Sequence, residues 1–273
     1  ACLLQEGNYE IANVPPLSDI QIMVRMLKSL NVRAEYHAPD TVKIWNTKHI
    51  RPIAPYELVT SMRASFFVAG PILARAGYAK VPLPGGCAIG SRPLDLHLKG
   101  FKALGAEVSI QHGFVELRAD RLVGNRVYLD FPSVGATENI LMAACLAEGQ
   151  SIIENAAQEP EIEDLGQFLI AGGAKISGLG TSTLVIDGVR NLKGKDYKVI
   201  SDRIEVGTLM IGAAITKGNV LIKNVVPDHL EPVIRKLQET GCDLDVQETE
   251  IRVQVKKDLR SVDIDTMPFP GFP

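Results

Sequence analysis

The chain has 273 residues, of which 46% are hydrophobic, 22% charged and 5% aromatic, and its net charge is −3. Because this length exceeds what one ordinary hydrophobic core holds, two domains are expected. The small negative charge offers no general attraction for nucleic acids, and no apolar run approaches the roughly 20 residues of a membrane-spanning helix. We therefore expect a globular protein that binds neither nucleic acid nor membrane.

One pattern recurs four times along the chain, at intervals of about 70 residues. In each copy, a helix ends at a small residue and a strand follows. These small residues are Asn31, Gly105, Gly173 and Gly241. Asparagine or glycine there is typical of the left-handed residue that ends a helix. Alternating apolar residues further on, as in 114–117, predict a strand pair in every copy.

Each copy also contains a helix of small and apolar residues, as in 141–149 and 209–215. Such near-continuous apolarity predicts helices that are buried on all sides. The expected fold is therefore α/β, built from inside-out, barrel-like repeats with helices inside and sheets outside. The chain begins within the last turns of one such helix and stops at Pro273, near where another helix should begin. From the repeats we expect a piece of a longer protein.

Four cysteines show neither the Cys-x-x-Cys spacing nor the clustered histidines of a zinc site. We therefore expect no metal site and no disulfide framework, and a reducing cytoplasm as the compartment. Cys145 and Cys242 stand where sister repeats have apolar or small residues, and Cys2 lies in a similar context. All three are predicted to be core thiols, whereas Cys87 has no counterpart in the other repeats.

The second repeat is about four residues longer than the others, and the extra residues fall between Pro84 and Gly90. A loop that packing does not require is more often functional. Three glycines let this loop approach a ligand closely, and Cys87 lies on it. Arg92 follows, whose guanidinium binds phosphate or carboxylate and favours the ionised form of a nearby thiol. The sequence predicts a loop that closes over an anionic substrate.

Other candidates lie at helix starts. Arg63 enters an apolar helix and needs an anion, either an internal acid or a ligand. Residues 133–135 begin the third apolar helix, where they either bind an anion through free N–H groups or merely cap the helix. Asp202 and Glu205 have the spacing of a capping box. His97 follows the cysteine loop and is either functional or a packing residue.

The stretch 84–97, with its glycines, Cys87 and Arg92, resembles the catalytic loop of the UDP-N-acetylglucosamine 1-carboxyvinyltransferase family, enolpyruvyl transferases of bacterial peptidoglycan synthesis. The stretches 62–65, 133–137, 159–162 and 202–205 are also similar to that family. The resemblance runs from end to end and implies an EPSP synthase-like fold of six repeats in two domains, of which about four are present. Residues 1–200 would form the first domain without its first helix, and 201–273 part of the second.

The resemblance implies transfer of the enolpyruvyl group of phosphoenolpyruvate to the 3′-hydroxyl of UDP-N-acetylglucosamine with release of phosphate. This is the first committed step of peptidoglycan synthesis, and hence of cell-wall growth, cell shape and division. No cofactor is implied, and the oligomeric state stays open. Cys87 would donate a proton to C3 of phosphoenolpyruvate and form a covalent adduct, and Arg92 would neutralise the anion. Substrate contacts would come from Arg63, Arg92, Pro93, Leu94, Asp95, Leu96, Ser133, Val134 and Gly135, with His97, Asp202 and Glu205 as further candidates.

The chain departs from the family pattern at three places. The family's lysine–asparagine pair would precede Ala1, and its aspartate general base would follow Pro273. Phe131 stands where some members have lysine. We therefore expect the chain alone to bind substrate weakly and to turn over poorly or not at all.

Three alternatives stay open at this point. A 5-enolpyruvylshikimate-3-phosphate synthase would catalyse the same reaction type on the same fold, but it does not use the cysteine loop. A non-catalytic repeat scaffold would tolerate replacement of Cys87. A thiol hydrolase needs a histidine beside the thiol, and the sequence places none there.

Overall fold

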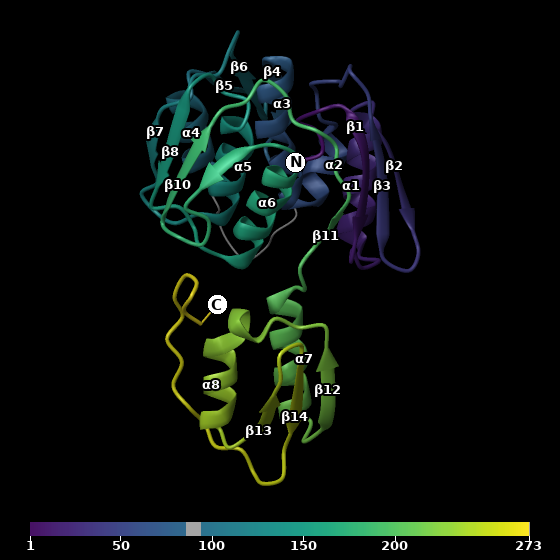
Figure 1. Ribbon diagram of the computed structural model, residues 1–273, viewed down its shortest axis with the longest axis vertical. Helices are drawn as coiled ribbons and strands as arrows, with labels where there is room; N and C mark the ends of the chain where they lie inside the picture. Colours follow the sequence, from purple (N-terminus) through teal and green to yellow (C-terminus); the bar gives the residue numbers. More distant parts are fainter. Residues whose placement is uncertain (86–93, 273) are drawn as a thin grey trace. The chain divides into compact units, whose positions relative to one another are not determined.

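The computed structural model describes residues 1–85 and 94–272. The chain divides into two compact units, Ala1–Val199 and Ile200–Pro273. Figure 1 labels most of the helices and strands of both units. That these units are the first domain and a partial second domain of a transferase stays a prediction.

The first unit contains β1 (Gly7–Ala12), α1 (Ser18–Ser29), β2 (Arg33–His37), β3 (Thr41–Asn46), α2 (Tyr56–Ser61), the 3₁₀ helix η1 (Arg63–Val68), α3 (Ala69–Ala76), β4 (Tyr78–Pro82), α4 (Asp95–Ala103), β5 (Glu107–Gln111), β6 (Phe114–Arg118), β7 (Arg126–Tyr128), α5 (Val134–Ala144), β8 (Gln150–Glu154), α6 (Pro160–Ala171), β9 (Lys175–Ser177), β10 (Thr183–Asp187) and β11 (Tyr197–Lys198). The second unit contains α7 (Arg203–Ile215), β12 (Asn219–Lys223), the 3₁₀ helix η2 (Pro227–Leu230), α8 (Glu231–Glu239), β13 (Asp243–Val246) and β14 (Glu250–Gln254).

The predicted fourfold repeat is confirmed by the sheets, which share one strand order. Each has its first and second strands on either side of the third, in the orders β1-β3-β2, β4-β6-β5, β8-β10-β9 and β12-β14-β13. The strands of each set pair antiparallel. The predicted helix-ending residues all have left-handed backbones, with φ of 67° at Asn31, 90° at Gly105, 103° at Gly173 and 94° at Gly241. The local signals in the sequence therefore identified a real structural unit.

Parallel pairings between repeats close the first unit into a ring. β7 follows the second repeat and pairs with β8 of the third. An isolated parallel bridge, Ile53 to Lys80, joins the end of the first repeat to β4 of the second. β11 follows the third repeat and pairs with β1 of the first. Each of the three repeats is therefore joined to the sheet of the next by a parallel pairing, in cyclic order, while the three sheets stay separate. In the second unit, residues 262–265 resemble residues 127–130 in sequence but form no strand.

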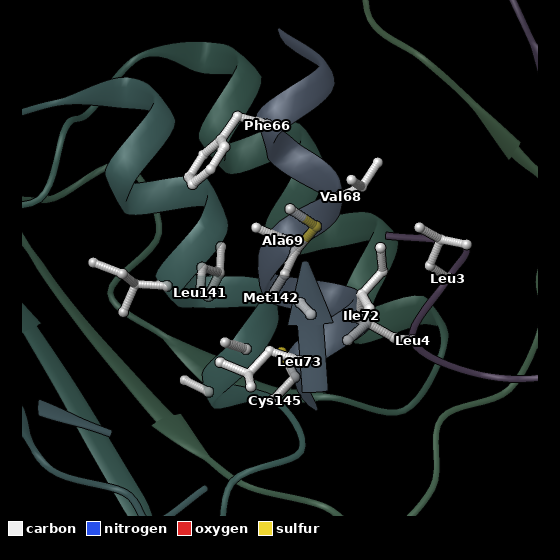
Figure 2. Close-up of a cluster of buried hydrophobic side chains, with 14 of the residues drawn as sticks. Leu3, Leu4, Phe66, Val68, Ala69, Ile72, Leu73, Leu141, Met142 and Cys145 are labelled. Carbon is white, nitrogen blue, oxygen red and sulfur yellow. The ribbon is translucent and has the colours of Figure 1, made fainter. Parts of the chain in front are cut away.

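The predicted inside-out arrangement is confirmed in the first unit. Helices α3 and α5 contact each other in its core, and most of their residues are buried. Figure 2 shows side chains of η1, α3 and α5 packed together with Leu3 and Leu4. The inward residues of β3, Val42 and Ile44, are almost fully buried against this core. Apolar helices thus fill the centre, and the sheets cover them.

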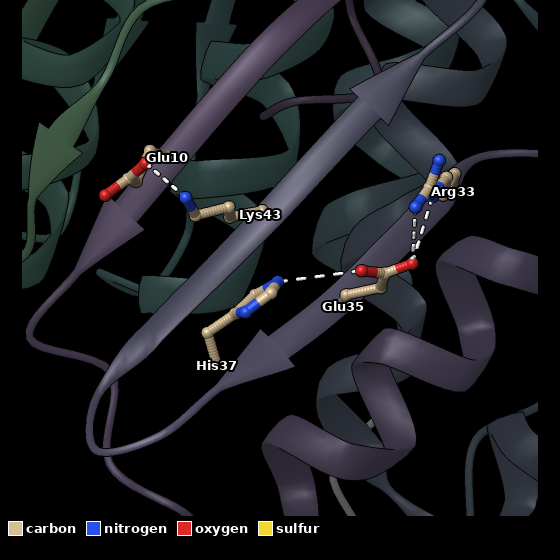
Figure 3. Close-up of polar contacts among 5 residues, drawn as sticks. All are labelled: Glu10, Arg33, Glu35, His37 and Lys43. Atoms are coloured by element: carbon tan, nitrogen blue, oxygen red, sulfur yellow. Dashed lines mark hydrogen bonds and ion pairs between the residues drawn. The ribbon is translucent and has the colours of Figure 1, made fainter.

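The outer face of the first sheet carries charges, as expected for a surface that faces water. Lys43 Nζ lies 3.0 Å from Glu10 Oε2, and Arg33 Nη2 lies 2.9 Å from Glu35 Oε1 (Figure 3). His37 Nε2 lies 3.6 Å from the other oxygen of Glu35. These exposed pairs stabilise the fold little, since such pairs are worth about 0–1 kcal/mol.

The predictions for the core thiols are confirmed for two of the three. Cys145 is 0% exposed and Cys242 is 5% exposed. Cys2 is only partly buried and packs against the edge of the core. Cys2 lies in the irregular turn before β1, whereas Cys145 is the C-cap of α5 at the end of that buried helix.

Candidate active site

Three of the predicted site residues, Cys87, Arg92 and Pro93, lie outside the described residues, together with the glycine loop from Gly86 onward. Their roles therefore stay predictions. The other candidates can be placed, and they fall at three helix starts in the first unit and one in the second.

Helix α4 begins immediately after that loop. Leu94 is its N-cap and is buried, and its carbonyl accepts a hydrogen bond from Leu98 N at 3.0 Å. Asp95 is exposed, and Leu96 is partly buried against the core. His97 lies on the buried face of the same turn and is 6% exposed. The first turn of α4 thus presents a carboxylate outward and an imidazole inward.

Helix α5 begins beside this imidazole. Ser133 is the N-cap, and its Oγ accepts a hydrogen bond from Ala136 N at 3.3 Å. Val134 and Gly135 form the first turn, whose N–H groups have no partner within the helix. A Cβ placed on Gly135 would lie 3.4 Å from His97 Nε2 and 2.9 Å from Phe67 Cε1. Glycine therefore allows the start of α5 to approach His97 without a shift of either.

The third helix start belongs to η1, whose first residue is the partly buried Arg63. Burial and, to a smaller extent, the positive charge of Arg63 lower the pKa of His97 to about 4, against the opposing effect of Asp95. The imidazole is therefore neutral at neutral pH. Since an electrostatic effect of this kind requires proximity, Arg63, His97 and Gly135 lie in one region. The sequence named each of these residues but did not predict that they meet.

A buried residue that the sequence analysis missed joins these helices. Asn139 of α5 is 0% exposed. Its Oδ1 accepts from Gly70 N at 2.9 Å, and its Nδ2 donates to Phe66 O at 3.1 Å. The same Nδ2 lies 3.1 Å from His97 Nδ1. One side chain thus links η1, α3, α4 and α5. The available signal was an amide inside a helix of mostly small and apolar residues, since buried polar groups need partners.

A partly buried acid, Glu138, also lies on α5. Burial raises the pKa of its carboxyl to about 8, and the negative charges of Glu161 and Glu159 act in the same direction. Phe131, where a lysine occurs in some members of the resembled family, is 59% exposed just before the helix. It therefore offers no charge to an anion at the start of α5.

The remaining candidates lie in the second unit. Asp202 is the N-cap of α7, and its Oδ1 accepts from Ile204 N at 2.7 Å and from Glu205 N at 3.2 Å. Both Asp202 and Glu205 are exposed. Asp202 therefore caps α7, as the capping-box prediction expected. Its role as a substrate contact stays a prediction.

Within residues 1–85 and 94–272, histidines, cysteines and acids form no cluster of three or more that could hold a metal ion. None of the helices in these ranges has the length and apolar composition of a membrane span.

Solved structures of other proteins share the fold of this chain. The enolpyruvyl transferase NikO from Streptomyces tendae superimposes with a TM-score of 0.86 at 22% identity, over 99% of this chain and 65% of that one. An EPSP synthase from Acinetobacter baumannii superimposes with a TM-score of 0.71 at 20% identity, over 95% of this chain and 61% of that one. The chain therefore has the fold of the enolpyruvyl transferases.

Its sequence then gives the family. The family model for EPSP synthase (3-phosphoshikimate 1-carboxyvinyltransferase) matches residues 1–273, so the chain belongs to this family. It is 52% identical over 274 residues to UDP-N-acetylglucosamine 1-carboxyvinyltransferase 1 of Caldanaerobacter subterraneus subsp. tengcongensis, covering 100% of this chain and 65% of the relative. The corresponding enzyme 2 of Carboxydothermus hydrogenoformans is 54% identical, with 99% and 65% covered, and that of Gloeobacter violaceus is 53% identical, with 100% and 60% covered. The chain thus spans less than two thirds of the length of these relatives, which agrees with the expectation of a longer protein.

Proposed function

We propose that this chain is part of an enzyme that joins the enolpyruvyl group of phosphoenolpyruvate to the 3′-hydroxyl of UDP-N-acetylglucosamine. The observation that carries the proposal is identity of 52–54% to relatives named for this transfer, over essentially the whole chain. The glycine and cysteine loop around Cys87 favours this substrate over shikimate 3-phosphate, which the name of the family model also admits.

In this reaction the sugar oxygen forms a bond to C2 of phosphoenolpyruvate while C3 takes up a proton. The 3′-hydroxyl gives up its own proton. The bond from C2 to the phosphate oxygen then breaks, C3 loses a proton, and the products are an enol ether and phosphate. Cys87 is the proposed proton donor to C3 and the residue that forms the covalent adduct. As a general acid, it must come within hydrogen-bond reach of the reacting carbon. Arg92 is proposed to neutralise the phosphoenolpyruvate anion.

The described helix starts suit the nucleotide sugar. Arg63 supplies a positive charge for the sugar substrate or phosphate, and the first turn of α5, from Ser133 to Gly135, supplies backbone donors for the diphosphate. Leu94 is buried, so a contact from it would use its backbone. Pro93, Asp95 and Leu96 complete the proposed border of the sugar site, with His97 beside it; Asp202 and Glu205 stay further candidates.

The proposal places the protein in cell-wall synthesis in the cytoplasm. Cys2, Cys145 and Cys242 are free thiols, which suits a reducing compartment. Because the chain spans 60–65% of its relatives, we expect the isolated chain to release phosphate far more slowly than they do. Release at the rate of a full-length relative would contradict this part of the proposal.

Thiol labelling with an epoxide phosphonate or an alkylating agent tests the role of Cys87. Burial raises the pKa of Cys145 to about 12 and raises that of Cys2 and Cys242. These three thiols should react slowly, since the thiolate is the nucleophile. We expect peptide mass spectrometry to find the label on Cys87, with faster labelling when UDP-N-acetylglucosamine is present, and none in Cys87→Ser. Equal labelling of all four thiols, unaffected by the sugar, would overturn the proposal.

A further inference from the structure

The hydrogen bonds of Asn139 have a fixed direction, because two of its partners are backbone groups. Gly70 N can only donate, so the atom that faces it at 2.9 Å must be the amide oxygen. Phe66 O can only accept, so the atom that faces it at 3.1 Å must be the amide nitrogen. Rotating the amide by 180° would set two donors against each other at Gly70 and two acceptors at Phe66.

This direction determines the proton position on His97. The amide nitrogen of Asn139 lies 3.1 Å from His97 Nδ1 and has an N–H to donate to it. Nδ1 must therefore carry a lone pair, and the single proton of the neutral ring lies on Nε2. Protonating Nδ1 would bring two N–H groups together in a buried site, which is costly.

The residues around His97 also favour a neutral, fixed imidazole ring. Phe66 meets the imidazole edge-on, with ring centroids 5.3 Å apart, and restrains its orientation. Arg63 from η1 disfavours a positive ring, and the exposed Asp95 from the first turn of α4 opposes this more weakly. The side of the ring that carries Nε2 faces the first turn of α5 at Gly135.

We infer that Asn139 is a positioning residue, which holds His97 as a neutral imidazole with its proton on Nε2, directed toward the start of α5. His97 then serves as a permanent hydrogen-bond donor for an anionic oxygen at that helix start, and it neither gives nor takes a proton in the reaction. The second part rests on the proposed function, in which the diphosphate of the nucleotide sugar supplies the oxygen. The first part stands on the geometry of the chain alone.

Nitrogen-15 NMR of the histidine side chains tests the first part directly. In the whole chain with ¹⁵N-labelled histidine, the His97 signals are assigned by their loss in His97→Gln. We expect an unprotonated Nδ1 and a protonated Nε2, unchanged between pH 7.5 and pH 5. A protonated Nδ1, or an average of both tautomers, would overturn the inference.

Asn139→Asp replaces the donor that faces Nδ1 with an acceptor. We expect Nδ1 to become protonated, the ring to gain its second proton at a higher pH, and the affinity for UDP-N-acetylglucosamine to fall about tenfold, the effect of one hydrogen bond to a charged group. Asn139→Ser, which is too short to reach Nδ1, should give a mixture of tautomers if the aspartate variant does not fold. An unchanged His97 signal in either folded variant would contradict the inference.

Asn46→Asp is the matched control. Asn46 is another buried amide, and its Nδ2 donates to Cys2 O at 2.7 Å and to Gln5 O at 3.0 Å. It shares no hydrogen-bond partner with Asn139 or His97. We expect it to lower stability without changing the His97 signals. If the tautomer and its response to Asn139→Asp are as expected but UDP-N-acetylglucosamine shifts no signal, the proposed function falls and the role of Asn139 remains.

Discussion

Helices α5 and α7 occupy the same place in their repeats, yet they differ in burial. Counted back from the glycine that follows each helix, Ile140 of α5 corresponds to Leu209 of α7. The first is 0% exposed and the second 52% exposed. Likewise Met142 is 3% exposed, whereas the corresponding Ile211 is 40% exposed.

The difference comes from the number of repeats that surround each helix. In the first unit three repeats surround a common core, so α5 packs against η1, α3, α4 and α6. In the second unit α7 contacts one sheet, α8 and the short η2. The same apolar pattern therefore gives a buried helix in one unit and a half-exposed one in the other. Burial here is a property of the ring of repeats and not of the helix sequence.

The largest expected effect of a single substitution follows from this contrast. Ile140→Ala should lower the free energy of unfolding of the first unit by about 2–5 kcal/mol, because it leaves a cavity in a closed core. Leu209→Ala should lower that of the second unit by less than about 1 kcal/mol. Urea unfolding followed by Trp45 fluorescence reports the first unit, and amide hydrogen exchange of α7 reports the second. Equal losses of unfolding free energy in the two variants would show that the number of surrounding repeats does not determine how much each helix contributes to stability.

A pH effect in the first unit should follow next in size. Glu138 has a pKa of about 8 in the folded chain, above its ordinary value of 4.5, so the folded state holds a proton that the unfolded state loses between these values. Stability should therefore fall by about 1–3 kcal/mol as the pH rises from 5 to 8. Glu138→Gln should flatten this dependence of the urea midpoint and exceed the wild type in stability at pH 8. If the urea midpoint of Glu138→Gln depends on pH as steeply as that of the wild type, Glu138 is not the cause of the pH dependence.

The two helix caps should differ less than the two cores. Ser133→Ala in α5 and Asp202→Ala in α7 each remove a side chain that accepts backbone N–H groups. Each should cost about 1 kcal/mol, because capping is local and does not depend on the surrounding repeats. Thermal unfolding of the intact chain measures both. A loss at Ser133 several times that at Asp202 would mean that its role extends beyond capping.

The smallest expected effect on stability is at Ile215, which is 73% exposed at the end of α7. Ile215→Ser should change stability by no more than about 0.5 kcal/mol. It should reduce binding of a hydrophobic dye, because it removes part of an exposed apolar face. Unchanged dye fluorescence would show that this face of α7 is covered in solution.

The sequence was most informative where the signal is local. The left-handed residues at Asn31 and Gly105 and the alternating strands fixed the repeat, because each depends on a few neighbouring residues. The same reasoning identified Arg63, His97 and Gly135 one at a time. Their meeting depends on how η1, α4 and α5 pack, which no local pattern contains.

Two features depend on distant partners, which a local pattern does not contain. Residues 262–265 resemble a strand in composition, but a strand also needs a neighbour to pair with. The sequence analysis did not name Asn139, because most residues of its helix are small or apolar. A buried amide nevertheless requires hydrogen-bond partners. Its partners Gly70 and His97 lie 69 and 42 residues away in the sequence.

Binding of UDP-N-acetylglucosamine to the intact ¹⁵N-labelled chain tests the central claim most directly. The account predicts saturable shifts of the Gly135 amide and the His97 ring in the first unit, with the amides of α8 unchanged. No shift at millimolar sugar nucleotide, or saturable shifts that leave Gly135 and His97 unaffected, would contradict it.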